Sequence, residues 1–314
     1  MKKITIIGSG RVGSTIAYSL ALQDIASEVV VIDIDQQRAL GEALDIRQGM
    51  PYDSTCWVHA GNYYDAKGSD IVVITSGVAR KPGQSRLELI NINIEILKAI
   101  IPNITKYAAD AVFIMVSNPV DILTYAFCKL SGIPENRVIG TGTILDTSRL
   151  RARLAEYCGV DPKNINAYVF GEHGDSSFIP WSIANVAQVP IEAFNRMSNI
   201  ENRLTMELNK EDVEKYIRGS GGKIIARKGA TFYAISSNVC HICKAILCGT
   251  NSTMAVSTMM HGEYGVKDVC LSILRIVGHG GICGKVTPTL TEEEHIKLHH
   301  SADVLKGIIA NLDL

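Results

Sequence analysis

Long apolar runs and an excess of charge of one sign are both missing from this 314-residue sequence. The charges nearly cancel, with 31 basic against 32 acidic residues, so no basic face is implied and we expect no nucleic-acid partner. No apolar stretch approaches the ~20 residues that a membrane-spanning helix needs. The N-terminal run Ile4–Ile7 is also shorter than the roughly 7–15 residues of a signal-peptide core. We therefore expect a cytoplasmic protein with no membrane partner.

The sequence also lacks the paired cysteine and histidine motifs that are typical of a structural zinc site. Its eight cysteines are expected to be buried thiols rather than disulfides, because the chain is expected to be cytoplasmic. Cys240 and Cys243 have Cys-x-x-Cys spacing, with Cys248 beyond, so a zinc or redox protein is one alternative. The pair lies inside an apolar helical pattern with no second pair nearby, so we expect core packing and no metal.

Short apolar runs alternate with segments of helical spacing through the first half of the chain. Runs without polar alternation are typical of strands buried on both faces of a parallel sheet. The alternation predicts an α/β fold with an N-terminal Rossmann domain, a doubly wound parallel sheet, over residues 1–143. The predicted strands are Lys3–Gly8, Glu28–Asp33, Asp70–Thr75 and Ala111–Ser117.

The second half is less regular and predicts an α+β substrate domain over residues 144–314. No low-complexity linker separates the two halves, so we expect them to pack directly together. The expected helices include Asp146–Cys158, Ser220–Leu247 and Glu292–Leu312, and the expected strands are Asn164–Phe170, Thr253–Met260 and Val269–Val277.

A glycine-rich motif, GSGRVG at residues 8–13, follows the first predicted strand and opens a predicted helix. Asp33 lies 20 residues after Gly13, at the end of the next strand, which completes the context of a dinucleotide-binding fingerprint. A carboxylate there can bind the adenosine ribose and would repel a 2′-phosphate, so NAD is favoured over NADP. The alternatives are a glycine turn that only packs helix on strand, and a solvated helix cap at Asp33. The expected cofactor-binding residues are Gly8, Gly10, Arg11, Val12, Gly13, Asp33, Thr75, Gly77, Ser117 and Asn118.

Candidate catalytic residues lie in two further motifs. His173 stands between glycines after a predicted strand, which is typical of a turn where a histidine can titrate near neutral pH. Asp146 and Arg149 are three residues apart on one predicted helix face. An arginine can bind a substrate carboxylate through two parallel hydrogen bonds, and an aspartate can orient a histidine. The alternatives are a structural histidine and a local Asp–Arg pair on a solvated surface.

The polar segment Arg80–Arg86 follows the third long predicted strand, at the sheet edge where α/β proteins bind ligands. Its proline and glycine are typical of a lid over an active site. The alternative is a solvated basic loop.

Together these motifs resemble the L-lactate/L-malate dehydrogenase family over the whole chain. The matching stretches are GSGRVGS, VVVIDID, ITSGVARKPGQSR, VSNPVDILTY, RVIGTGTILDTSRLR, GEHGDS and KGATFYAI. The resemblance implies that His173 donates a proton to the keto oxygen and that Asp146 orients it. It implies that Arg149 binds the substrate carboxylate, while Arg86 closes with the lid and polarises the carbonyl.

The same resemblance implies that Asn118 holds the nicotinamide end and that Thr231 lines the substrate pocket. The activity it implies is NAD-dependent interconversion of a small L-2-hydroxy acid and its 2-keto acid, by hydride transfer coupled to proton transfer. A nucleotide-binding protein without catalysis is a remote alternative. Such a protein would be expected to have a gap in the catalytic set, and none is found.

Two signals disagree about the substrate. GTGTILDTSR, GEHGDS and Thr231 resemble lactate dehydrogenases, which reduce pyruvate. Arg80, six residues before Arg86, resembles the arginine with which malate dehydrogenases bind the second carboxylate of oxaloacetate. An unpaired arginine facing the methyl group of pyruvate would be costly unless it turned to solvent. We therefore expect L-lactate dehydrogenase activity, with L-malate dehydrogenase as the alternative.

Self-association and regulation are implied by the resemblance alone. The family forms homodimers or homotetramers. Many bacterial members bind fructose 1,6-bisphosphate between subunits through an arginine and a histidine. Arg151 matches the arginine, whereas Asn166 stands at the position of the histidine, so we expect no strong activation by this ligand.

Overall fold

The structure is a computed structural model that describes residues 2–78, 86–198 and 208–314, without the side chains of residues 86 and 195. Its strands are β1 (Lys3–Ile7), β2 (Glu28–Ile32), β3 (Trp57–Ala60), β4 (Ile71–Ile74), β5 (Val112–Met115), β6 (Val138–Gly140), β7 (Ile165–Asn166), β8 (Asn185–Val186), β9 (Val189–Pro190), β10 (Ser252–His261), β11 (Lys267–Gly278) and β12 (Gly281–Lys285). Its α-helices are α1 (Arg11–Leu22), α2 (Gln36–Gly49), α3 (Arg86–Ala108), α4 (Val120–Leu130), α5 (Ile144–Cys158), α6 (Ile191–Met197), α7 (Lys210–Lys228), α8 (Tyr233–Cys248) and α9 (Glu292–Ile309).

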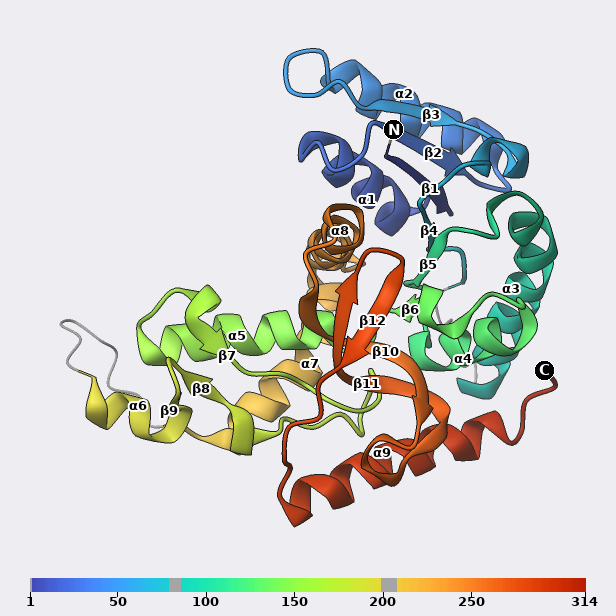
Figure 1. Cartoon of the computed structure of the whole chain (residues 1–314). Coiled ribbons are helices and arrows are strands. Elements are labelled where there is room, and N and C mark those ends of the chain that lie inside the picture. The colour runs from blue at the N-terminus through green and yellow to red at the C-terminus, as the bar shows by residue number, and fades with distance from the viewer. Residues whose placement is uncertain (1, 79–85, 199–207) are drawn as a thin grey trace.

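Within these ranges the large sheet has nine strands in the order β12-β11-β10-β6-β5-β4-β1-β2-β3 (Figure 1). The six strands from β6 to β3 are parallel, and their order is that of a doubly wound dinucleotide-binding domain. The chain reverses its direction of winding between β1 and β4. Ligands of such sheets bind beyond the carboxyl ends of the strands at this point. The predicted Rossmann architecture is therefore confirmed.

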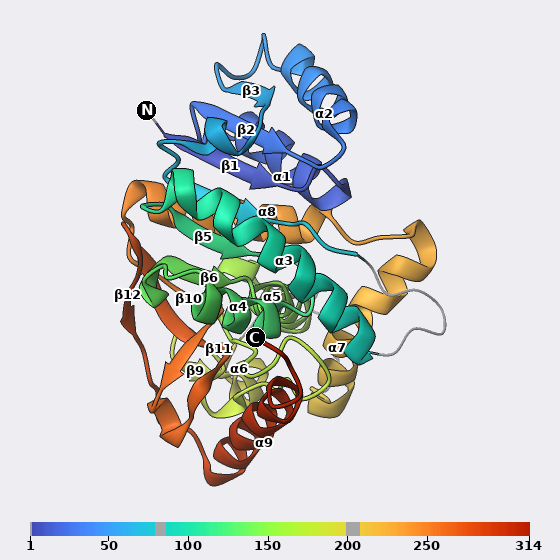
Figure 2. The ribbon, with the colours of Figure 1, turned by 90° about the vertical axis from the view of Figure 1, so that its right-hand side faces the viewer.

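All the parallel strands except the edge strand β3 are buried on both faces of the sheet, to which successive side chains point in turn. Ile4 and Ile6 of β1 pack against α1, α2 and α8, whereas Ile7 packs in the layer formed with α3 and α4. Figure 2 shows α3 and α4 in front of the strands. The two-sided burial explains why these strands are uninterrupted apolar runs in the sequence.

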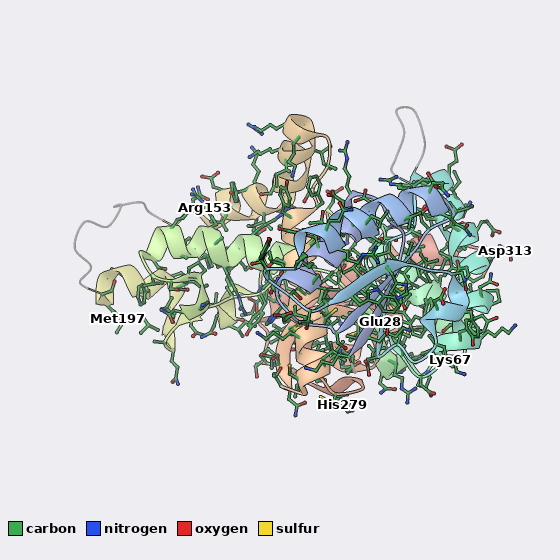
Figure 3. All side chains as sticks on the ribbon, turned by 90° about the horizontal axis from the view of Figure 1, so that it is seen from above. Glu28, Lys67, Arg153, Met197, His279 and Asp313 are labelled. Carbon is green, nitrogen blue, oxygen red and sulfur yellow. The ribbon has the colours of Figure 1, made fainter. Side chains whose placement is uncertain are left out.

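The C-terminal half continues the sheet rather than standing apart from it. Antiparallel strand β10 pairs with β6 through Ser257 and Gly140, and β11 and β12 follow it to the sheet edge. Helix α8 packs along α1 of the first half. Helix α9 packs against the main core, whereas α5 to α7 and the small sheet β7-β8-β9 share an apolar cluster of their own. This part extends to one side of the molecule, where Met197 lies (Figure 3).

Two predictions for the second half are wrong. The long helix expected over Ser220–Leu247 is two helices, because α7 ends at Lys228 and Gly229 adopts a left-handed conformation with φ 82°. A glycine reaches this conformation without steric cost, which allows the chain to turn before α8 begins. The strand expected over Asn164–Phe170 is short, because only Ile165 and Asn166 pair with β8.

Most of the cysteines are buried thiols, as expected. Cys240 and Cys243 lie on α8 in the apolar layer between that helix and the sheet, which confirms core packing for the pair. Burial raises the pKa of the Cys240 thiol to about 12, so it stays protonated. Cys248 lies at the exposed end of the same helix.

Among the described residues, no helix combines the length and apolar character needed to cross a membrane.

Candidate active site

The loop between β1 and α1 has the geometry of a dinucleotide-binding turn. Gly8 has φ 107°, and a Cβ atom on Gly13 would lie 1.8 Å from the Gly8 carbonyl oxygen, so both positions require glycine. A Cβ atom on Gly10 would meet nothing within 4 Å, which leaves its backbone open to a ligand. Arg11 and Val12 begin α1 directly behind, so free N–H groups at the helix start face the same space. This arrangement fits a dinucleotide pyrophosphate.

Asp33 is held at the end of β2 by the same loop. Its Oδ2 accepts hydrogen bonds from the Ser9 backbone N–H at 2.5 Å and from the Ser9 hydroxyl at 2.9 Å. Its Oδ1 accepts from the Asp35 N–H at 3.0 Å. Burial alone would raise the pKa of Asp33, but these donors and the nearby Arg38 lower it. The carboxylate therefore stays ionised and fixed, as ribose recognition requires.

The other expected cofactor-binding residues follow β4 and β5. Thr75 donates a hydrogen bond to the Gly8 carbonyl at 2.9 Å, which ties the two strand ends together. Gly77 packs closely against Asn93, and a Cβ atom there would lie 3.2 Å from the Asn93 Oδ1. The Ser117 hydroxyl donates to the Ser76 carbonyl at 2.6 Å, and Asn93 donates to the Asn118 carbonyl at 2.8 Å.

A cavity of about 300 Å³ opens beside the loop between β1 and α1, with Val12 of α1 and Asn118 in its wall. Six of the expected site residues line it: Val12, Asn118, Asp146, Arg149, His173 and Thr231. The structure therefore brings together groups that lie far apart in the sequence. Arg80 lies outside the described residues. Arg86 begins α3, but its side chain lies outside them as well.

His173, Asp146 and Arg149 form one hydrogen-bonded chain at the wall of the cavity. The Asp146 Oδ2 lies 2.6 Å from the His173 Nδ1, and its Oδ1 accepts from the Arg149 Nη1 at 2.9 Å. The Asp146 side chain is 9% exposed and that of His173 is 27% exposed. The bond to Nδ1 leaves the other ring nitrogen, Nε2, without a hydrogen-bond partner among residues that the structure describes. That nitrogen is the one available to a substrate.

The electrostatics of this chain favour a charged histidine. Burial alone would lower the pKa of His173, but Asp146 outweighs it and raises the pKa above its usual value. Burial would raise the pKa of Asp146, whereas His173 and Arg149 hold it below the ordinary range. The pair therefore favours the protonated imidazole more strongly than an isolated histidine would.

The loop that carries His173 is fixed from three sides. Gly171 exchanges two backbone hydrogen bonds with Ser272 of β11, at 2.9 and 3.0 Å. The Glu172 N–H donates to the Ser301 hydroxyl of α9 at 2.7 Å, and the His173 N–H donates to the Asp121 Oδ2 of α4 at 2.7 Å. This support holds the imidazole without help from a ligand.

Sequence reasoning missed several residues at or near this cavity, four of which bear on its shape and charge. Arg218, Gly221 and Gly222 of α7 line it, and Asp121 lies beneath the His173 loop. Three glycines within four residues of a helix interior were a usable signal, since each disfavours the helix by about 1 kcal/mol relative to alanine. Asp121 gave no local signal.

Arg151 and Asn166, the two positions matched to the fructose 1,6-bisphosphate site of bacterial relatives, have partners within their own chain. The Arg151 Nε donates to the Ala167 carbonyl at 3.1 Å, and its guanidinium lies 4.8 Å from the centre of the Tyr168 ring. Asn166 donates to Asn185 at 3.2 Å.

A dinucleotide-binding sheet whose strand ends lead to a histidine–aspartate pair and an arginine defines a class of enzyme. The chain is a nicotinamide-dependent dehydrogenase that acts on a small anionic substrate at a CH–OH group. Residues 2–140 match the model of the lactate/malate dehydrogenase NAD binding domain, and residues 143–313 match that of the alpha/beta C-terminal domain. The chain therefore belongs to the lactate/malate dehydrogenase family, and its cofactor is NAD.

Individual relatives agree with this assignment. The chain is 43% identical over 314 residues to L-lactate dehydrogenase of Thermoanaerobacterium saccharolyticum, covering 100% of both chains. It is 42% identical to L-lactate dehydrogenase of Acetivibrio thermocellus, covering 100% of this chain and 98% of that one. The minor L-lactate dehydrogenase of Enterococcus mundtii, a solved structure, matches with a TM-score of 0.93 at 36% identity, covering 100% of this chain and 99% of that one.

Proposed function

We propose that this protein is an L-lactate dehydrogenase that reduces pyruvate to L-lactate with NADH. The observation that carries the proposal is the chain His173–Asp146–Arg149, which lies on a cavity at the end of the dinucleotide path. It supplies a proton donor, a group that keeps the donor charged, and a cation for the substrate carboxylate. The full-length similarity to L-lactate dehydrogenases supports the choice of substrate.

When bound, NADH supplies the hydride. Arg149 binds the carboxylate of pyruvate and so places the keto group near His173. The His173 Nε2 donates its proton to the keto oxygen as negative charge develops there. Asp146 stabilises the imidazolium before transfer and keeps Nδ1 protonated after it. Asn118, Thr231 and Arg86 complete the pocket in this proposal, with Arg86 polarising the carbonyl.

L-Malate dehydrogenase is the second candidate, and Arg80 is the observation that favours it. If this guanidinium faces the closed site, it would bind the second carboxylate of oxaloacetate. The proposal for pyruvate therefore requires that Arg80 turn away from the substrate.

The test is NADH oxidation by the purified protein with pyruvate and with oxaloacetate, side by side. We expect the higher kcat/KM with pyruvate. A higher value with oxaloacetate would replace lactate with malate as the product. Arg80→Gln separates the two further, because it should lower kcat/KM only for oxaloacetate if Arg80 selects a dicarboxylate.

We further propose a homodimer or homotetramer, and a division into a cofactor-binding part, residues 1–143, and a substrate-binding part, residues 144–314. The family resemblance supports the homodimer or homotetramer, and light scattering of the purified protein tests it.

The boundary between the two parts is supported by the secondary structure, since β6 ends at Gly140 and α5 begins at Ile144.

A further inference from the structure

Asp121 is a buried carboxylate that the mechanism above does not use. It is the second residue of α4 and is only 3% exposed. Its Oδ2 accepts the backbone N–H of His173 at 2.7 Å. Within the described residues its Oδ1 has no hydrogen bond of ordinary geometry, and the buried Ser257 hydroxyl of β10 is the neutral donor that lies near the carboxylate. Burying a carboxylate with one backbone N–H and one neutral hydroxyl near it is costly, which raises the question of what its charge does.

The surroundings of Asp121 contain few groups that could neutralise it. His173 and Glu172 face it from the loop, Ser257 from β10, and Cys270 from β11. Burial raises the pKa of Asp121 to about 6, and Glu172 raises it slightly, whereas Ser257 and His173 lower it. At neutral pH the carboxylate is therefore mostly ionised, and His173 is the group near it that can carry the opposite charge.

His173 is consequently held between two carboxylates. Asp146 contacts its ring and Asp121 contacts its backbone, from helices α5 and α4 respectively. Arg149, also on α5, opposes protonation of the ring, whereas Asp121 adds to the effect of Asp146. A second negative charge offsets the positive charge that Arg149 brings to the site.

We propose that Asp121 is a positioning residue for the proton donor, which fixes the His173 loop through its backbone N–H and stabilises the protonated imidazole with its charge. The proposal rests on the assigned role of His173 in the proposed function. It differs from the role of Asp146, because Asp121 touches neither the ring nitrogen nor the cavity.

The test replaces Asp121 by Asn, whose amide keeps the size and the acceptor for the His173 N–H but removes the charge. Asp121→Ser is a second, smaller replacement without charge. Asp110→Asn is the matched control, because the Asp110 side chain is fully exposed and does not line the cavity. Asp121→Asn keeps the acceptor and should not lower the melting temperature at pH 8, whereas Asp121→Ser leaves the His173 N–H unpaired and should lower it modestly, so thermal denaturation of both variants accompanies the kinetics.

The first readout is the pH profile of kcat/KM for pyruvate reduction. We expect its alkaline limb to move about 0.5–1 pH unit to lower pH in both Asp121 variants, and to stay in place in the control. The second readout needs no turnover. Diethyl pyrocarbonate modifies neutral imidazole, so its rate at His173, followed by peptide mass spectrometry, reports the same pKa.

A shift in both readouts supports the proposal. Unmoved profiles and unmoved modification rates in both folded variants would overturn it and leave Asp121 as a structural residue. If the parent protein oxidises no NADH with pyruvate, the proposed function fails. The modification rates then still decide whether Asp121 raises the pKa of His173.

Discussion

Replacing Asp146 by Asn tests whether this carboxylate acts by its charge. The variant keeps the size of the side chain but removes the negative charge that lies 2.6 Å from the His173 Nδ1. An opposite charge in such contact raises a histidine pKa by about 1–3 units, and each unit is worth about 1.36 kcal/mol. Losing it should reduce the imidazolium population by up to about 10- to 1000-fold, and the full factor applies at pH values where the parent histidine is itself mostly neutral.

Pyruvate reduction consumes that proton, so kcat/KM at pH 7.5 should fall by up to the same factor. The sign of the pH dependence follows directly. Because the pKa of His173 is raised in the parent and would be lower in the variant, the deficit should shrink as the pH is lowered. Arg149 strengthens this effect, because in the variant its charge near His173 is no longer balanced.

The assay is steady-state NADH oxidation between pH 5.5 and 8.5, with NADH binding measured by fluorescence. Asp45→Asn, at an exposed position of α2, is the control for removal of a carboxylate. A deficit of the same size at every pH would refute the electrostatic reasoning and reduce Asp146 to a purely steric support. Loss of NADH binding would mean that the substitution disturbs the cofactor site rather than the protonation of His173.

Three further predictions concern the cofactor, the cavity and the fold. Asp33→Ala should raise KM for NADH and lower the ratio of kcat/KM with NADH to that with NADPH, because the carboxylate would no longer bind ribose or repel a 2′-phosphate. Unchanged KM and kcat/KM values for both cofactors would refute this. Gly222→Ala places a Cβ where no atom lies within 4 Å, so thermal denaturation should show about 0.5–1 kcal/mol of added stability. Because Gly222 lines the cavity, the added methyl group should also lower kcat/KM for branched 2-keto acids relative to pyruvate. An unchanged ratio of the two kcat/KM values would refute this second effect. Glu263→Gln breaks the buried ion pair with Arg275 at 2.7 Å and should cost about 3–5 kcal/mol at pH 7, measured by urea denaturation. The folded pKa of Glu263 is lowered to about 2, so the ion pair stabilises the parent fully above the unfolded pKa of about 4.3 and is lost as the pH falls towards 2; equal acid sensitivity of the parent and the variant would contradict this.

Four of the six parallel strands of the cofactor half could be predicted, because buried parallel strands leave uninterrupted apolar runs in the sequence. The strands that escaped prediction lack this signal. In β3 Trp57 is 52% exposed, and β6 contains only three residues. The break between α7 and α8 escaped because its apolar spacing continues on both sides of Gly229. There a single left-handed residue decides the path of the chain.

The candidate site could be predicted as a set of residues but not as an arrangement. Asp146 and Arg149 share a helix face, so their 2.9 Å contact follows from spacing alone. The contact between Asp121 and His173 spans 52 residues of sequence and two elements, α4 and the loop after β7. It depends on tertiary packing, which no local pattern encodes.

The central claim is that His173, backed by Asp146, is the proton donor at the end of the NADH path. The most direct test is His173→Asn, with turnover and NADH binding measured on the same preparation. The account predicts a loss in kcat of about 10²- to 10⁴-fold with unchanged NADH binding. Turnover close to that of the parent protein would contradict it and would assign the proton to another group.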